Sequence, residues 1–194
     1  MQVDFSVELG RDDPTLEIPW SSPDGVILYQ NVKLNPGALE QIPEAADYPE
    51  LRQFLAEINA PGSKLESAKC DVWSTTEISP EEEIFGEPWK FASYVDLLFT
   101  SLAPRESFQY HEQFLKALTA ALTTTCDTPA LVDFVLRRCF THDGEAVRNG
   151  FYFTSYIFGY GPSESRAREN WSTALARVAQ ALLKTSSAPV SPPL

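Results

Sequence analysis

The sequence has few cysteines and lacks any familiar catalytic or metal-binding pattern. Its 194 residues include three cysteines at wide spacings, an odd number that does not suit the framework of a small disulfide-rich secreted protein. Neither a Gly-x-Ser-x-Gly elbow nor a Ser-x-x-Lys motif is present. We therefore predict no cofactor and no metal site, and we favour a noncatalytic protein over an enzyme.

Long apolar runs are also missing. No stretch approaches the roughly 20 apolar residues that a membrane helix needs. The segment 1–5 has neither the basic nor the apolar region of a signal peptide. From these absences and the scarce cysteines we expect a soluble protein of the reducing cytoplasm, with no membrane partner.

Basic residues are scarce, and acidic residues are concentrated in the first half of the chain. The formal net charge of −12 argues against nucleic acid, because phosphate recognition needs a positive surface. Residues 1–90 contain 18 Asp and Glu against six Lys and Arg, whereas residues 91–194 contain nine of each. This acidic N-terminal half, with Glu81, Glu82 and Glu83 as a candidate interaction face, predicts a basic protein partner. The alternative is that acidic loops only keep the protein soluble.

The residues that are plentiful predict a folded domain of the α+β class. Hydrophobic residues make up 43% of the chain and aromatic residues 12%, which is typical of globular proteins. We expect an antiparallel sheet of six or seven strands, with two long and one short amphipathic helices packed on one face. Residues 1–184 form this single domain, and the Pro- and Ser-rich tail 185–194 is predicted to be disordered.

The order of the predicted elements suggests an N-terminal meander followed by a repeat. Residues 1–45 contain strand-like runs at 3–9, 16–20 and 26–29, separated by turn residues, and predict a β-meander. In residues 46–184 a helix followed by two strands occurs twice, and a final helix closes the chain. The helices are predicted at 47–58, 106–124 and 163–184, and the strands at 69–78, 91–100, 131–141 and 151–160. An internal duplication would explain this repeat.

Two of these strands carry a charged residue inside an apolar run. Asp96 and Asp133 lie in such runs, and the period of two places Arg137 on the same strand face as Asp133. With Tyr156, these side chains are candidates for the lining of a polar pocket, where desolvation would raise a carboxyl pKa. The alternative is a solvent-facing surface or a cross-strand Asp–Arg pair.

A second candidate site is the turn from the last strand into the last helix. Gly159, Gly161 and Ser163 precede a predicted helix N-terminus, where backbone amides can hold an anion, and Arg166 adds positive charge. The alternative is that the glycines only permit a tight turn.

The aromatic segment 150–158 is apolar or aromatic on both faces of the predicted strand. One face should lie under the helices, and the other under the N-terminal meander, a second subunit or a ligand. We therefore expect a protein-interaction or self-associating module, with a homodimer as one form. The alternative is a small-molecule-binding domain or an atypical enzyme with a polar pocket between sheet and helices.

Overall fold

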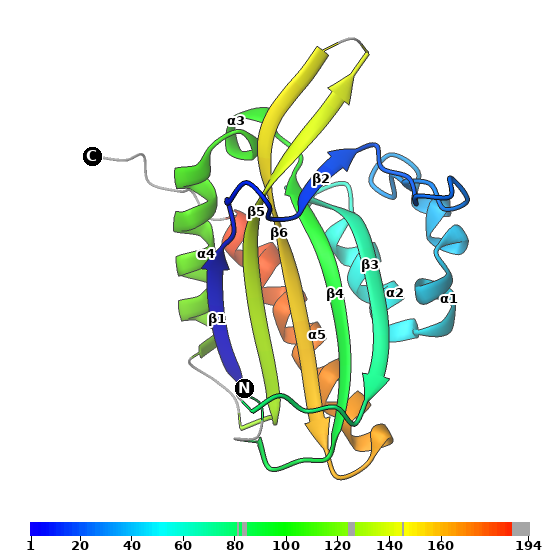
Figure 1. Cartoon of the computed structure of the whole chain (residues 1–194), viewed down its shortest axis with the longest axis vertical. Coiled ribbons are helices and arrows are strands. Elements are labelled where there is room, and N and C mark those ends of the chain that lie inside the picture. Colours follow the sequence, from blue (N-terminus) through cyan, green and yellow to red (C-terminus); the bar gives the residue numbers. More distant parts are fainter. Residues whose placement is uncertain (81, 83–84, 124–126, 145, 188–194) are drawn as a thin grey trace.

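The protein folds as one mixed β-sheet with helices packed against a single face, as shown in Figure 1. The computed structural model describes residues 1–80, 82, 85–123, 127–144 and 146–187. The predicted α+β class is confirmed. The sheet has six strands: β1 (Gln2–Val7), β2 (Thr15–Ile18), β3 (Leu65–Thr75), β4 (Trp89–Phe99), β5 (Ala130–Asp143) and β6 (Ala146–Gly161).

The strand order corrects the prediction for the N-terminal part. The path through the sheet is β1-β5-β6-β4-β3, and the neighbours β5–β6, β6–β4 and β4–β3 are antiparallel as expected. However, β1 and β2 run parallel to β5 and lie one after the other along the same edge of it. The expected antiparallel N-terminal meander is therefore wrong, because a meander needs successive strands to pair with each other. Among the described residues, segment 26–29 contributes one isolated bridge, between Ser21 and Leu28.

The helices lie behind the strands in Figure 1 or, in the case of α1, beside β3. They are the 3-10 helix η1 (Pro36–Gln41) and the α-helices α1 (Pro43–Asp47), α2 (Pro49–Ile58), α3 (Leu102–Arg105), α4 (Phe108–Thr123) and α5 (Glu164–Ser187). Residues 185–187, predicted to be disordered, thus belong to α5, and 188–194 lie outside the described residues. No helix within the described ranges has the length and apolar character needed to span a membrane.

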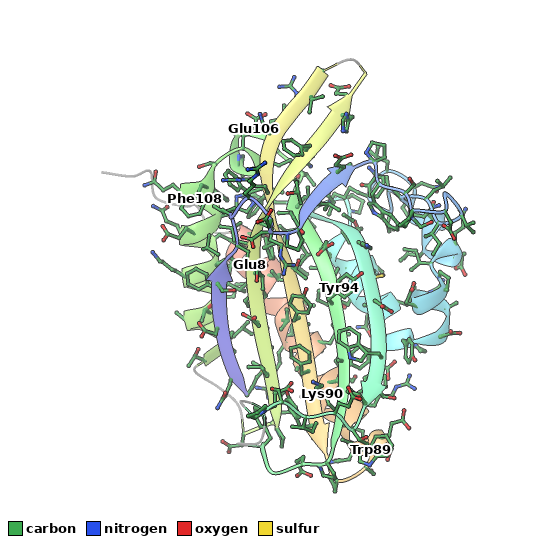
Figure 2. The ribbon with its side chains drawn as sticks, viewed as in Figure 1. Glu8, Trp89, Lys90, Tyr94, Glu106 and Phe108 are labelled. Carbon is green, nitrogen blue, oxygen red and sulfur yellow. The ribbon has the colours of Figure 1, made fainter. Side chains whose placement is uncertain are left out.

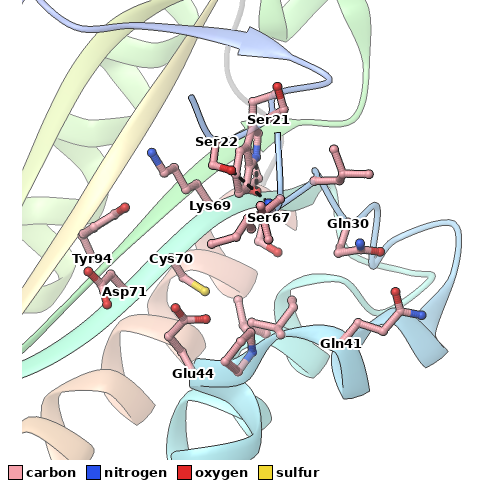
Figure 3. A pocket seen from close by; sticks show the side chains of 18 of the residues that line it. Ser21, Ser22, Gln30, Gln41, Glu44, Ser67, Lys69, Cys70, Asp71 and Tyr94 are labelled. Atoms are coloured by element: carbon pink, nitrogen blue, oxygen red, sulfur yellow. Dashed lines mark hydrogen bonds between the residues drawn. The ribbon is translucent and has the colours of Figure 1, made fainter. Parts of the chain in front are cut away.

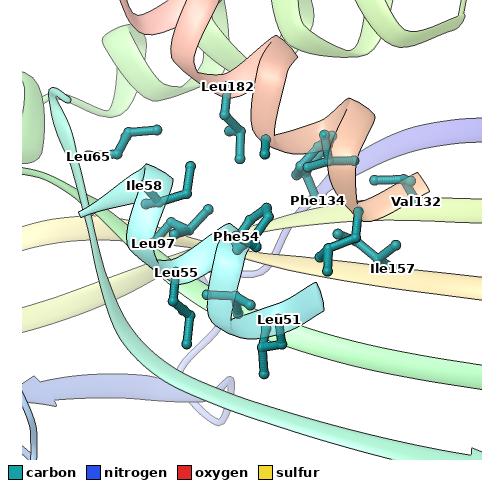
Figure 4. Packing of buried hydrophobic residues seen from close by; sticks show 14 of the residues in the cluster. Leu51, Phe54, Leu55, Ile58, Leu65, Leu97, Val132, Phe134, Ile157 and Leu182 are labelled. Carbon is teal, nitrogen blue, oxygen red and sulfur yellow. The ribbon is translucent and has the colours of Figure 1, made fainter. Parts of the chain in front are cut away.

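The main core fills the space between the sheet and α2, α4 and α5. Figure 4 shows side chains of α2, such as Phe54 and Ile58, meeting Leu182 of α5 and residues of the central strands. Trp171 of α5 and Phe153 of β6 are completely buried. Burying apolar area stabilises by about 25 cal/mol per Å², so this core makes a large contribution to the folding free energy.

A glycine sets the distance between β6 and α5. A Cβ atom on Gly159 would lie 2.2 Å from the Trp171 nitrogen and 2.3 Å from the Ala167 carbonyl oxygen. No other residue type fits there, so Gly159 lets the helix backbone rest directly on the strand.

The order helix–strand–strand occurs twice, as α2-β3-β4 and as α4-β5-β6. Both strand pairs are antiparallel, and β4 and β6 are neighbours at the centre of the sheet. The expected order of elements is therefore present, while its origin in a duplication stays a prediction.

Candidate functional site

The face of the sheet opposite the helices, called the open face below, is covered at its two ends and most extensively at one of them. There β2 and the hairpin of residues 20–29 lie over the strands, and Leu16 and Ile18 pack with Cys139 and Tyr152 in a second, smaller core. At the other end Phe85 stacks on Tyr160 of β6, with 4.3 Å between ring centroids, and Glu82 accepts a hydrogen bond from the Tyr160 hydroxyl. Between these ends, around Tyr94 in Figure 2, no helix or strand lies over the sheet in the part of the chain that the structure describes. The middle of the open face is thus left available.

Five residues form one row across this available middle part. The strand registers pair Asp4 with Asp133, Asp133 with Tyr156, Tyr156 with Tyr94, and Tyr94 with Asp71. We call this set the acidic-aromatic row. Because residues in register share a face of the sheet, two tyrosines lie at its centre with carboxylates on both sides.

The two tyrosines belong to a group of four aromatic rings, called the aromatic floor below. Its members are Trp73, Tyr94, Tyr156 and Phe158, all half-buried. Neighbouring ring centroids are 6.0 Å apart for Tyr94 and Tyr156, 6.3 Å for Tyr156 and Phe158, and 6.5 Å from Trp73 to Tyr94 and to Phe158. The floor is therefore a continuous aromatic surface rather than scattered side chains.

A hydrogen-bond network centred on Arg137 borders the floor. The Arg137 guanidinium donates to Glu8 at 2.7 Å, to the Thr154 hydroxyl at 2.9 Å and to the Tyr156 hydroxyl at 3.3 Å. Thr154 in turn donates to Asp96 Oδ1 at 2.6 Å. Burial raises the pKa of Asp96 to about 6, although the Thr154 hydroxyl and the Arg137 charge oppose the rise.

The structure thus brings together three of the four predicted pocket residues, Asp96, Arg137 and Tyr156, in one network. Asp133 faces Tyr156 across the β5–β6 ladder, and its pKa is raised by burial and by the charges of Asp4 and Glu8. These residues lie on the side of the sheet opposite the helices, where Asp96 and Arg137 are buried and Asp133 and Tyr156 are half-buried, and not between the sheet and the helices.

The carboxylates of the row differ from the other acidic groups around them. Glu8 is neutralised by Arg137, whereas no ion pair is formed by Asp4, Asp71 or Asp133 within the described part of the chain. The row therefore presents negative charge to whatever approaches the open face.

The predicted acidic interaction face is wrong for Glu82. Its side chain is buried, accepts hydrogen bonds from Lys90 at 2.9 Å and from the Tyr160 hydroxyl at 2.6 Å, and forms an ion pair with that lysine. Burial alone would raise the pKa of Glu82, but these hydrogen bonds outweigh it and lower the pKa. Glu81 and Glu83 lie outside the described residues.

The predicted anion-binding turn has a different role. Gly159 and Gly161 are required by close packing, since a Cβ on Gly161 would also lie 2.7 Å from the Ala167 nitrogen. The Ser163 hydroxyl accepts the Arg166 backbone N–H at 3.3 Å, and the Arg166 guanidinium pairs with Glu169 at 2.6 Å. The helix end and the arginine are both occupied by the chain itself.

A cavity of about 500 Å³ lies along the outer side of β3, between this strand, the 20–29 hairpin and the start of α1. Figure 3 shows Cys70 and Glu44 near its centre, with Asp71 and Tyr94 at one end. Burial raises the pKa of the Cys70 thiol, which therefore stays protonated and is a poor nucleophile. None of the predicted pocket residues lines this cavity.

Several residues of these sites were not predicted from the sequence. Asp4, Asp71, Trp73 and Phe158 join the row or the floor only through the pairing of strands that are distant in sequence. The alternation of Asp71 and Trp73 was the available signal, because period two places both on one face of β3.

Comparison with known proteins gives no relative for this chain: no family model, curated protein or solved structure matches it.

Proposed function

We propose that this protein is a noncatalytic binding module that holds a basic segment of a partner protein on its open face. The observation that supports the proposal is the acidic-aromatic row, in which two tyrosines lie between carboxylates on a surface left uncovered by the described chain. Aromatic residues are enriched at the centres of protein interfaces, where they combine a large contact area with few rotamers.

A lysine or arginine side chain fits this arrangement for two reasons. The face of an aromatic ring attracts a cation, which contributes about 0.5–1 kcal/mol at an exposed site. Two cationic side chains of this protein already lie over rings at the borders of the aromatic floor. Lys90 Nζ is 5.5 Å from the centroid of the Phe158 ring, and Arg137 Cζ is 5.8 Å from the centroid of the Tyr156 ring. Asp71 on one side and Asp133 on the other would then pair with the partner's charge.

The same charges argue for a different protein as partner rather than a second copy of this chain. In a twofold dimer each surface meets itself, so two open faces would bring unpaired carboxylates together. Like charges at an interface cost free energy, and a basic segment would avoid this cost. Self-association, the other form of the predicted interaction, is therefore less well supported.

The proposal can be tested with a random 12-residue peptide library selected on the immobilised protein. We expect the selected peptides to be rich in Lys and Arg, and their affinity to fall as salt rises, because the contacts include exposed charges. Selection on the double variant Asp71→Lys, Asp133→Lys should instead favour acidic peptides. The control variant Glu169→Lys changes charge on an exposed site of α5, on the other side of the sheet.

Two results would overturn the proposal. One is a selected pool no richer in basic residues than the starting library. The other is an unchanged preference after both carboxylates are reversed.

The cavity beside β3 supports a second candidate function, the binding of a small molecule. Its volume of about 500 Å³ falls within the range of ligand sites, and both apolar and polar side chains line it. Native mass spectrometry of protein purified from cells would detect such a ligand as an added mass. Removal of that mass by Cys70→Trp, which would fill the cavity, would assign it to this site.

A further inference from the structure

The outer edge of β3 is closed by side chains along its first half. Lys33 Nζ donates to the Leu65 carbonyl oxygen at 3.0 Å, and Asn59 Oδ1 accepts the Ser67 N–H at 3.1 Å. The Trp20 indole donates to the Ala68 carbonyl oxygen at 2.8 Å. These contacts protect the edge in the way that natural sheets protect an exposed strand.

This protection stops after Ala68. Main-chain groups of successive residues in an antiparallel ladder point alternately towards and away from the partner strand. A bulge at Ala68 shifts this alternation by one residue, so that Ser67 and Ala68 both face outward. Beyond the bulge, Lys69, Asp71 and Trp73 are in register with Asp96, Tyr94 and Ala92, which lie an even number of residues from Thr100, whose N–H bonds to Lys64 of β3. The N–H and C=O groups of Cys70, Val72 and Ser74 therefore face the outer edge. Among the described residues no strand pairs with this edge, and of these three N–H groups only that of Val72 has a hydrogen bond, to its neighbour Asp71 Oδ1 at 2.7 Å.

A cavity and exposed apolar side chains lie beside this unpaired edge. The cavity begins where the protection ends, at Ser67 to Asp71. On its rim the hairpin presents Val26, Ile27 and Leu28, three successive apolar residues that are exposed by 77%, 56% and 56%. Exposed apolar residues beside an unpaired strand edge are typical of a surface to which another chain binds.

We propose that the basic segment of the partner binds as an extended strand added to β3. Its main chain pairs with Cys70, Val72 and Ser74, as in other complexes formed by strand addition. The partner residue in register with Asp71 continues the acidic-aromatic row as its sixth member and is a lysine or arginine. The residue in register with Trp73 is aromatic or apolar.

The unpaired main-chain groups favour an extended strand over a helix as the occupant. A helix uses its own N–H and C=O groups internally, whereas an added strand lies about 4.8 Å away and satisfies the groups of both chains. The inference rests on the function proposed above, because it specifies how the same basic partner is held.

Hydrogen exchange of backbone amides, measured by NMR with a peptide selected as described above, tests the inference. Saturation with the peptide should slow exchange of the Cys70, Val72 and Ser74 amides at least tenfold. The Lys69, Asp71 and Trp73 amides point towards β4 and serve as internal controls with little change.

The peptide itself supplies a second test. Methylation of backbone nitrogens at alternate positions should weaken binding about fivefold to tenfold per site where the N–H faces β3, since one hydrogen bond is worth about 1 kcal/mol. Methylation at the intervening positions should have little effect.

In the protein, Val72→Pro removes one outward N–H and should weaken binding similarly, whereas Val72→Thr retains it. If the Val72→Pro variant does not fold, the binding of the methylated peptides still tests whether the partner adds as a strand.

The outcomes separate the two proposals. If no basic peptide is selected, the proposed function fails. If a basic peptide binds and shifts the ring signals of Tyr94 and Tyr156 while the Cys70, Val72 and Ser74 amides exchange at their former rates, the function stands and strand addition is wrong.

Discussion

The two faces of the sheet are built from the same strands but are covered to different extents. On β6, Phe153 and Ile157 point to the helices and are fully buried, whereas Tyr156 and Phe158 point to the open face and are half-buried. Both faces are rich in aromatic residues, so composition alone does not distinguish them. The difference is that α2, α4 and α5 cover one face, while β2, the 20–29 hairpin and the turn with Glu82 and Phe85 cover only part of the other. We relate this partly covered aromatic face to the partner binding proposed above.

Truncating one ring on each face should separate these roles most clearly. We expect Phe153→Ala to lower the free energy of unfolding by about 3–5 kcal/mol, because it leaves a cavity among buried rings. Phe158→Ala should cost about 1 kcal/mol, as its ring is partly in water already. Urea denaturation of both variants measures the contrast, and equal losses would make the open face part of the core.

The two faces should also respond to pH in opposite directions. His111 of α4 is fully buried on the helix side, and burial lowers its pKa to about 4. The stability that depends on its neutral form is present above about pH 6.5 and is lost as pH falls from there through 4, a change of about 3 kcal/mol. His111→Asn, which does not titrate and retains a donor for the Ser107 carbonyl, should lose this dependence when Tm is followed between pH 7 and 4.

On the open face, the group whose shifted pKa makes stability depend on pH is Asp96. Because its pKa is raised from 3.8 to about 6, the folded state binds this proton more tightly than the unfolded state. Its contribution to stability is therefore favourable below about pH 4 and is lost as pH rises through 6, by roughly 2–3 kcal/mol. Asp96→Asn should flatten this part of the Tm profile. A profile unchanged by the substitution would contradict the shift.

The smallest effect is expected for Tyr156→Phe. The substitution removes the hydroxyl that accepts a hydrogen bond from Arg137 at 3.3 Å but keeps the ring of the aromatic floor. Stability should change by less than about 1 kcal/mol, and affinity for basic peptides should be retained. Tyr156→Ala should abolish most of that affinity at a similar stability, as measured by calorimetry. If both variants bind alike, the ring is not part of the site.

The sequence allowed the local features of the fold to be predicted, but not the long-range pairing. The stripes containing Leu115 in α4 and Trp171 in α5 follow a period of 3.6 residues and are buried as expected. The alternation in β1 indicated a strand, yet period two does not reveal which strand will pair with it. Asp4 pairs with Asp133, which lies 129 positions further along the chain. A parallel pairing over this distance leaves no pattern within either segment of the sequence.

The same distinction applies to the candidate site. Asp96 and Arg137 could be found because a charge within an apolar strand is visible in the sequence. Glu82 was misassigned because the residues that bury and pair it, Lys90 and Tyr160, come from other strands. The row of five residues depends on four registers at once, and no single segment contains that information.

The parallel pairing of β1 with β5 also has a consequence for synthesis of the protein. At about 5–20 residues per second, the ribosome takes roughly 6–26 s to make the residues between Asp4 and its partner Asp133. During that interval Val3 and Phe5 have no strand to pair with, while β3 and β4 can already form their hairpin. Strand β1 is thus made well before its partner, and a chaperone acting on the nascent chain would find it free until β5 has been synthesised.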